Sequence, residues 1–310
     1  MVALAVVAGL SLACTTEPNP EGETGPNGGA RLSSTSPRET SENPGSPSAR
    51  PTASESLARL PEAPAAGPAA LADQLNRVGS TLRDPNAAAA DVRRAGELQQ
   101  LAVRALSGAS DAFRRNVTAR LDPATASVTR ACLGAALVLG GLTTPQRTLP
   151  RWRIVAPPSP RRLLGHYRAA QRRTGVPWTY LAAIHLVETR MGRIRGASTA
   201  GALGPMQFLP STWDLYGAGG DINDPRDAIL AAGRLLRANG APGNMAEALF
   251  HYNPSDSYVR AVSEYARTMR RSATAYRGFW HWRVLYRHTR GTYVLPVGYP
   301  DTRPVLLPEG

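Results

Sequence analysis

Apolar residues recur every three or four positions along most of this chain, and this helical spacing limits the possible folds more than any other feature. In residues 71–82 leucine and valine draw a single stripe, and similar runs follow, separated by Gly and Pro. The expected helices cover residues 71–82, 88–106, 112–121, 124–139, 160–174, 178–190, 225–239, 245–252 and 257–269. The sequence therefore predicts a mainly α protein.

The end of the chain departs from this spacing. Residues 284–299 close on alternating and β-branched side chains bounded by Gly and Pro, which predicts a short C-terminal β hairpin. The four helices expected before residue 145 carry no convergent polar cluster. They are interpreted as an accessory helical region, to which the sequence assigns no function.

The first 14 residues form a short, uncharged, apolar segment that ends at Cys14. The stretch from Leu10 to Cys14 resembles a bacterial lipoprotein signal, whose cysteine is lipidated after cleavage. Ser11 stands where such signals prefer leucine, and no basic residue precedes the segment, so a plain export signal is the alternative. Residues 15–68, rich in Pro, Gly, Ser and Thr, are expected to form a disordered tether. These segments predict an exported protein, held by a lipid anchor at the outer face of the cell membrane or in the cell wall.

The basic residues are all arginine and give a formal net charge of +13. They form no long run, so a scattered, solvated surface is preferred over a specific anion-binding patch, and no nucleic-acid partner is expected. The sequence holds no Cys/His cluster, phosphate loop or calcium loop, so neither a metal nor a cofactor is expected. Cys132 lies in an apolar run and is expected to be a small buried side chain. We expect a monomer.

One acidic residue lies on the apolar face of the helix expected at residues 178–190. Leu181, Ile184 and Glu188 follow at intervals of three and four, which directs the carboxyl towards the core. Burial and the negative end of the helix dipole both raise the pKa of such an acid, as a general acid near neutral pH requires. The spacing alone leaves a surface glutamate paired with one of the following arginines equally open.

The segment that follows breaks this tie, because it resembles the lytic transglycosylases of the lysozyme-like superfamily. Three family motifs stand in order as Glu188-Thr189, Gly204-Pro205-Met206-Gln207 and His251-Tyr252-Asn253. The first two lie within a stretch similar to both the soluble-lytic-transglycosylase type and the membrane-bound B type. The resemblance covers residues 150–275 and implies a lysozyme-like α domain that acts on peptidoglycan.

The resemblance makes Glu188 the catalytic acid and base for the β-1,4 bond between N-acetylmuramic acid and N-acetylglucosamine. Gln207 and Tyr252 would hold the sugar and the catalytic carboxyl, while Asn253 would cap or orient that cluster. The other substrate-binding candidates are Thr189, Gly204, Met206, Trp213 and Tyr216.

Some of these aromatic and polar residues have a structural alternative. Core packing is equally open for Trp213 and is favoured for Tyr258, which begins an apolar stripe. His251 is interpreted as a partly exposed residue at a helix end, in preference to a polar group behind the site.

The resemblance also implies that no second carboxyl is needed. The sugar's acetamido group would stabilise the developing cation and its C6 hydroxyl would attack, which leaves a 1,6-anhydro end. Asp221 and Asp256 are the acids to which the sequence gives no local structural role. A goose-lysozyme-like hydrolase using one of them is one alternative, and a non-catalytic peptidoglycan-binding lipoprotein is the other.

These inferences divide the chain into five predicted segments. They are a signal peptide with lipobox (1–14), a disordered linker (15–68), an accessory helical region (69–145), a transglycosylase domain (150–275) and a C-terminal extension with the hairpin (276–310).

Overall fold

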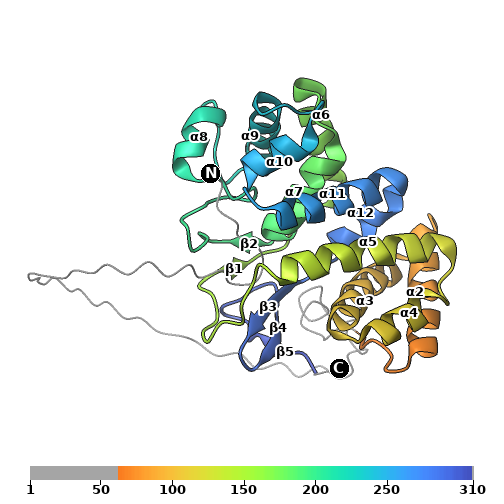
Figure 1. Cartoon of the computed structure of the whole chain (residues 1–310). Helices are drawn as coiled ribbons and strands as arrows, with labels where there is room; N and C mark the ends of the chain where they lie inside the picture. The colour runs from red at the N-terminus through yellow and green to blue at the C-terminus, as the bar shows by residue number, and fades with distance from the viewer. Residues whose placement is uncertain (1–61, 309–310) are drawn as a thin grey trace, which may run out of the picture.

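The computed structural model describes residues 62–308. These residues form eleven helices and a few short antiparallel strands, so the predicted mainly α fold with a C-terminal β hairpin is confirmed. In Figure 1 the helices α6, α8, α9 and α10 gather at the top, α2, α3 and α4 lie to the lower right, and the strands β3 to β5 lie below. The predicted signal segment, Cys14 and most of the predicted linker lie outside the described residues.

The four helices expected in the accessory region form within a few residues of their predicted bounds. They are α2 (Pro68–Arg83), α3 (Ala89–Gly108), α4 (Asp111–Thr118) and α5 (Pro123–Gly140). Side-chain caps explain two of the starts, because Ser110 accepts a hydrogen bond from Phe113 N and Asp122 accepts one from Thr125 N.

The predicted helices of the following region also form. They are α6 (Pro160–Thr174), α7 (Trp178–Thr189), α9 (Pro225–Ala238), α10 (Met245–Tyr252) and α11 (Asp256–Arg271). Ser159, Asp224 and Asn244 cap three of these starts with their side chains, as their places in the sequence indicate. Gly175 ends α6 in the left-handed conformation, with φ 73°.

Two short helices were not expected from the sequence. The first, α8 (Pro210–Tyr216), has no side-chain cap, and its Leu215 is 76% exposed, so no apolar stripe marks it. The second, α12 (Ala273–Trp280), follows α11 after a single residue and buries Tyr276 and Phe279. A helix of eight residues is marginal by itself, so tertiary packing is what stabilises α12.

The largest hydrophobic core joins the accessory helices to the rest of the molecule. It contains side chains of α6, α7 and α9 to α12, together with Val103 of α3 and Cys132, Ala135 and Leu139 of α5. Cys132 is a free, buried thiol, as expected. Among the described helices α5 is long and apolar enough to cross a membrane by length and composition alone, and here it packs against α11 and α3.

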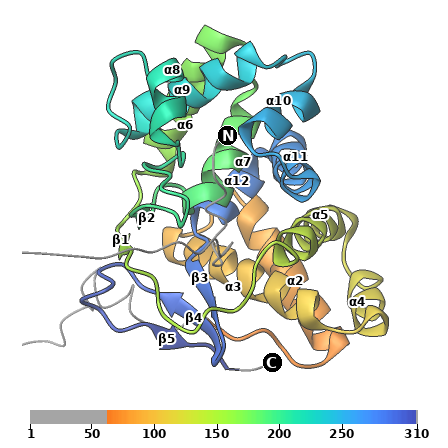
Figure 2. The ribbon, with the colours of Figure 1, turned by 60° about the vertical axis from the view of Figure 1, so that its left-hand side comes forward.

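Two small antiparallel sheets tie distant segments together. Strand β1 (Arg153–Ile154) pairs with β2 (Ile194–Arg195), which comes shortly after α7. The predicted hairpin is formed by β3 (Val284–His288) and β4 (Gly291–Leu295), and β5 (Val305–Leu306) adds a third strand. Figure 2 shows this second sheet beside α3.

The expectation that the accessory helices carry no polar cluster is wrong, because α3 buries three polar side chains against the start of β3. Glu97 accepts from Arg283 Nε at 3.0 Å. Gln100 exchanges hydrogen bonds with the backbone N–H and C=O of Arg283 at 2.7 and 2.9 Å. Gln99 accepts from Trp282 Nε1 at 3.3 Å. We call this contact between α3 and residues 282–283 the seam.

Candidate active site

Glu188 occupies the last turn of α7, a helix almost all of whose residues are buried. Its side chain is 0% exposed. Tyr258, in the first turns of α11, donates its hydroxyl to Glu188 Oε1 at 2.7 Å. The carboxyl therefore lies inside the domain, between two helices that pack on each other.

The arginines that follow Glu188 point elsewhere. Arg190 Nη1 donates to Leu186 O at 2.6 Å, and Arg193 Nη1 donates to Arg190 O at 3.1 Å. Arg195 Nη1 reaches Asn223 O at 3.1 Å. A surface ion pair between Glu188 and one of these arginines, which the spacing had left open, is therefore not formed.

The chain reverses sharply after the glutamate. Arg190, Met191 and Gly192 all adopt positive φ, at 52°, 61° and 83°. Non-glycine residues in this conformation are uncommon, and such backbone strain gathers at functional sites.

The Gly204–Gln207 motif forms a tight loop. Leu203 and Phe208 close it with two backbone hydrogen bonds of 2.8 and 2.9 Å. Gly204 has φ 73°, and a Cβ there would lie 1.9 Å from the carbonyl oxygen of Ile222, so the position requires glycine. Gln207 has φ 50° and donates its Nε2 to Gly204 O at 2.9 Å, which stabilises the loop from within.

Two motif residues hold this loop by its carbonyl groups. Thr189 donates its hydroxyl to Pro205 O at 2.6 Å and accepts from Gly192 N at 3.1 Å. Tyr252 donates to Met206 O at 2.6 Å. Thr189, Met206, Gln207 and Tyr252 are all nearly or fully buried. The three sequence motifs therefore meet in one place, with the loop fixed between α7 and α10.

Tyr258 is the site residue that the sequence did not identify. It is fully buried, as the favoured core interpretation expected, and its ring stacks on Tyr252 with centroids 6.3 Å apart. Burial, followed by the charge of Glu188, raises the pKa of the Tyr258 hydroxyl well above its usual value. Tyr258 is thus a neutral donor to the carboxyl, a contact that Tyr252 had been expected to make. The apolar stripe could not reveal where the hydroxyl points.

Asn253 ends α10 in extended conformation and is 4% exposed. Its side-chain nitrogen Nδ2 has no hydrogen-bond partner within residues 62–308. A buried amide donor of this kind normally finds a protein, water or ligand partner. The expected capping or orienting hydrogen bond from this nitrogen is not formed in the described part of the chain.

The aromatic candidates lie at the edge of the core. Trp213 is partly buried and meets Phe208 edge to face, with centroids 5.5 Å apart. Tyr216, also partly buried, packs against the same core. His251 is about half exposed and lies 3.3 Å from Glu247 one turn earlier, so the preferred interpretation of this histidine is confirmed.

A second titratable group on α7 lies one turn before the glutamate. His185 is fully buried, with Nδ1 2.7 Å from the Tyr167 hydroxyl. Burial lowers its pKa to about 3, so the ring is neutral near pH 7. A Cβ on Gly192 would lie 3.1 Å from its Nε2.

The structure gives Asp221 and Asp256 local roles that the sequence did not show. Asp221 is exposed and accepts from Asn223 N at 2.8 Å, which forms a turn. Asp256 is exposed in the first turn of α11, where a negative charge favours the helix.

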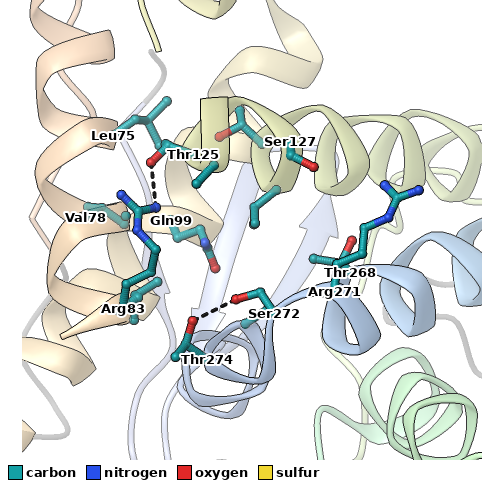
Figure 3. Close-up of a pocket in the computed structure, with 16 residues that line it drawn as sticks. Leu75, Val78, Arg83, Gln99, Thr125, Ser127, Thr268, Arg271, Ser272 and Thr274 are labelled. Carbon is teal, nitrogen blue, oxygen red and sulfur yellow. Dashed lines mark hydrogen bonds between the residues drawn. The ribbon is translucent and has the colours of Figure 1, made fainter. Parts of the chain in front are cut away.

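Two cavities of similar size lie elsewhere, and Glu188 lines neither of them. One, of about 200 Å³, lies between α2, α3, α5 and the junction of α11 with α12 (Figure 3). Its Arg83 bonds Thr125, and its Ser272 bonds Thr274. The other cavity borders the seam.

Residues 166–274 match the family model described as Transglycosylase SLT domain. This segment runs from α6 to the start of α12 and contains Glu188, the Gly204–Gln207 loop and Tyr258. This match supports a similarity to the lytic transglycosylases of the lysozyme-like superfamily, a family that acts on peptidoglycan. Neither a search of curated proteins nor a search of solved structures returned a match.

Proposed function

We propose that this protein cleaves the β-1,4 bond between N-acetylmuramic acid and N-acetylglucosamine in peptidoglycan, with Glu188 as acid and base and a 1,6-anhydro product. The observation that carries this proposal is the buried carboxyl of Glu188, bonded by the neutral hydroxyl of Tyr258 beside the loop that Thr189 and Tyr252 hold. Removal from water favours the neutral, proton-donating form of a carboxyl. The neutral hydroxyl of Tyr258 permits the protonated form of Glu188 more readily than a positively charged arginine would.

The chemistry requires one proton to leave Glu188 and one to return. Glu188 first protonates the glycosidic oxygen, the bond from that oxygen to C1 breaks, and the acetamido group stabilises the positive charge at C1. The carboxylate then accepts the proton of the C6 hydroxyl as its oxygen bonds to C1. No water is consumed, and the acid is restored.

The local roles of Asp221 and Asp256 argue against the hydrolase alternative. A hydrolase of the inverting kind positions its water with a second carboxyl. Both aspartates are exposed and act in a turn or a helix start, and neither is hydrogen-bonded to Glu188. The transglycosylase scheme needs no such group.

The proposed place of action is the outer face of the cell membrane or the cell wall. This part rests on the sequence of the first 68 residues, whose apolar start ends at Cys14. Lipidation of Cys14 would anchor the protein, and the Pro-, Gly- and Ser-rich segment would let the catalytic domain reach the glycan strands. Mass spectrometry of the mature protein from its membrane fraction would detect a diacylglyceryl group on Cys14, and an unmodified N-terminus would contradict the anchor.

A pair of variants tests the role of Glu188. Glu188→Gln keeps the shape of the side chain and removes its proton, so cleavage of purified peptidoglycan should fall by about 10²–10⁴-fold. Glu247→Gln is the matched control, because Glu247 is exposed on α10 of the same domain and should leave the rate unchanged. Undiminished cleavage by Glu188→Gln would remove the catalytic role from this residue. Absence of cleavage by the parent protein would favour the non-catalytic binding alternative.

A further inference from the structure

The cavity beside the seam has a volume of about 210 Å³. It lies where α3, the β3–β4 hairpin, α12 and the segment after α7 meet. Its apolar and aromatic lining residues are Ile154, Ala156, Pro157, Trp280, Val284, Leu295, Pro296 and Val297. Its polar lining residues are Arg93, Glu97, Arg193, His281 and Arg283.

The positive charge of these polar lining residues is not balanced by Glu97 alone. Arg193 is only 9% exposed, and its guanidinium carbon lies 5.3 Å from the centre of the Trp280 ring. Neither that ring nor the carbonyl of Arg190 supplies a full negative charge. Within residues 62–308 no ion pair joins a carboxylate to Arg193 or Arg93, and the carboxylate of Glu97 pairs with Arg283 at 3.0 Å.

The titration of two groups agrees with this imbalance. Burial lowers the pKa of Arg193 to about 9, although the charge of Glu97 opposes the shift. Burial and then the charges of Arg193, Arg93 and Arg277 lower the pKa of His281 to about 4. An anion in the cavity would relieve this repulsion.

The size of the cavity and its mixed polar and apolar lining limit what the anion can be. At roughly 30 Å³ for each water, 210 Å³ holds about seven waters, which is more than a single ion needs. It is less than the roughly 300–1,000 Å³ of a site for a drug-sized ligand. The cavity therefore fits the end of a longer molecule, with an anionic head for the arginines and an aliphatic body for the apolar lining residues.

We propose that this cavity binds the terminal carboxylate of a short aliphatic peptide. Arginine suits a carboxylate because its planar donors match the two oxygens. The stem peptides carried by peptidoglycan have this chemistry, and naming them as the source rests on the proposed function. The cavity would then hold the peptide branch of a glycan while Glu188 acts on the strand.

Calorimetric titration of the full chain tests the ligand class. N-acetyl-alanyl-alanine should bind, whereas its C-terminal amide should bind at least about tenfold more weakly because the amide lacks the charge. Inorganic phosphate should also bind more weakly than the acid, because it leaves the apolar lining residues uncovered. Equal affinity for acid and amide, tighter binding of phosphate, or no binding of the acid would overturn the proposal.

Variants locate the binding. Arg193→Gln should weaken binding of the acid by about tenfold. Arg93→Gln, at a partly buried position, should also weaken it and covers the case in which the Arg193 variant does not fold. Arg94→Gln is the matched control, since Arg94 is exposed on the same helix, lies 3.8 Å from Asp91 and does not line the cavity. An equal loss of affinity in Arg94→Gln and Arg93→Gln would show that only the net charge of the protein matters, and it would overturn the proposed site.

The same titration separates this site from the catalytic one. Glu188→Gln should bind the acid with unchanged affinity while it fails to cleave glycan. Cleavage by a parent protein that does not bind the acid would overturn the peptide site and leave the proposed function in place. Binding of the acid by a parent protein that does not cleave glycan would overturn the proposed function and leave the peptide site in place.

Discussion

Residues 62–308 bury two glutamates, Glu188 in the candidate active site and Glu97 in the seam, and the two have different surroundings. Glu188 is 0% exposed and accepts from the Tyr258 hydroxyl at 2.7 Å. Glu97 is 7% exposed and accepts from the Arg283 guanidinium at 3.0 Å. The first donor is neutral, whereas the second is positively charged.

This difference separates a group suited to chemistry from a group suited to structure. An adjacent positive charge favours the ionised form of a carboxyl over the protonated form. A tyrosine whose own pKa is raised stays neutral, so the carboxyl beside it can hold a proton or release one. We therefore expect changes at Glu188 and Tyr258 to alter the rate of cleavage, and changes in the seam to alter the free energy of unfolding.

The largest expected effect in the seam follows from Glu97→Gln. Removing one partner of a buried ion pair costs about 3–5 kcal/mol. The free energy of unfolding in urea should fall by about that amount, while the cleavage rate per folded molecule should change little. An unchanged stability, or a hundredfold loss of rate in the folded variant, would contradict the division between the two regions.

Acid should destabilise both regions through one histidine in each, because burial lowers the pKa of both rings. The pKa of His281 near the seam is lowered to about 4 and that of His185 on α7 to about 3, whereas an unfolded histidine titrates near 6.5. The unfolded chain therefore binds these protons first. The stability contributed by each neutral ring is fully present above pH 6.5 and is lost as the pH falls towards the folded pKa.

Urea unfolding between pH 7 and pH 3 measures this loss, which should approach about 1.4 kcal/mol per pH unit for each histidine. His281→Gln and His185→Gln should each reduce the slope. The two variants should differ below pH 4, where the folded His281 has already gained its proton. A slope that neither substitution changes would show that other groups govern the acid response.

Tyr258→Phe should lower the cleavage rate by about tenfold, because it removes one neutral hydrogen bond to the catalytic carboxyl. A donor to the carboxylate favours the ionised form, so its loss favours the protonated acid. The alkaline limb of the pH–rate profile should therefore move to higher pH. Tyr252→Phe is the matched control, since its hydroxyl bonds Met206 O, and this variant should leave the limb in place. An equal shift of the alkaline limb in both variants would contradict a specific effect of the Tyr258 hydrogen bond on the pKa of the catalytic carboxyl.

The smallest expected effect concerns the loop. Thr189→Val keeps the shape of the side chain and removes the donor to Pro205 O. A lost neutral hydrogen bond of about 1 kcal/mol corresponds to about a fivefold lower rate if the loop positions the glycan. Thr189→Ser keeps the hydroxyl and should restore the rate. A serine variant as slow as the valine variant would show that the methyl group, and not the hydroxyl, matters here.

Much of the helical fold could be predicted because residues at the helix ends are themselves local sequence signals. Three helices begin after a side-chain cap that the sequence shows, at Ser159, Asp224 and Asn244. The helix α6 ends at Gly175, where glycine favours the left-handed conformation. The helix α12 gives no such signal, since its two turns depend on Tyr276 and Phe279 packing into a core built from distant segments.

In the candidate site, too, local sequence signals could be predicted and contacts between distant segments could not. The spacing of Glu188 on its helix left a buried carboxyl and a surface ion pair equally open. The motifs favoured the buried carboxyl and predicted which segments meet it. The direction of the Tyr258 hydroxyl depends on how α11 packs on α7, 70 residues earlier, which no local pattern records. The seam was missed for a similar reason, because the polar residues of α3 are buried by a partner about 183 residues later in the chain.

The most direct test of the central claim is mass spectrometry of purified peptidoglycan digested by the full chain. Fragments that end in 1,6-anhydro-N-acetylmuramic acid, absent after digestion with Glu188→Gln, are the predicted result. Fragments that end in reducing N-acetylmuramic acid, with one added water for each cut, would contradict the account and make the protein a hydrolase.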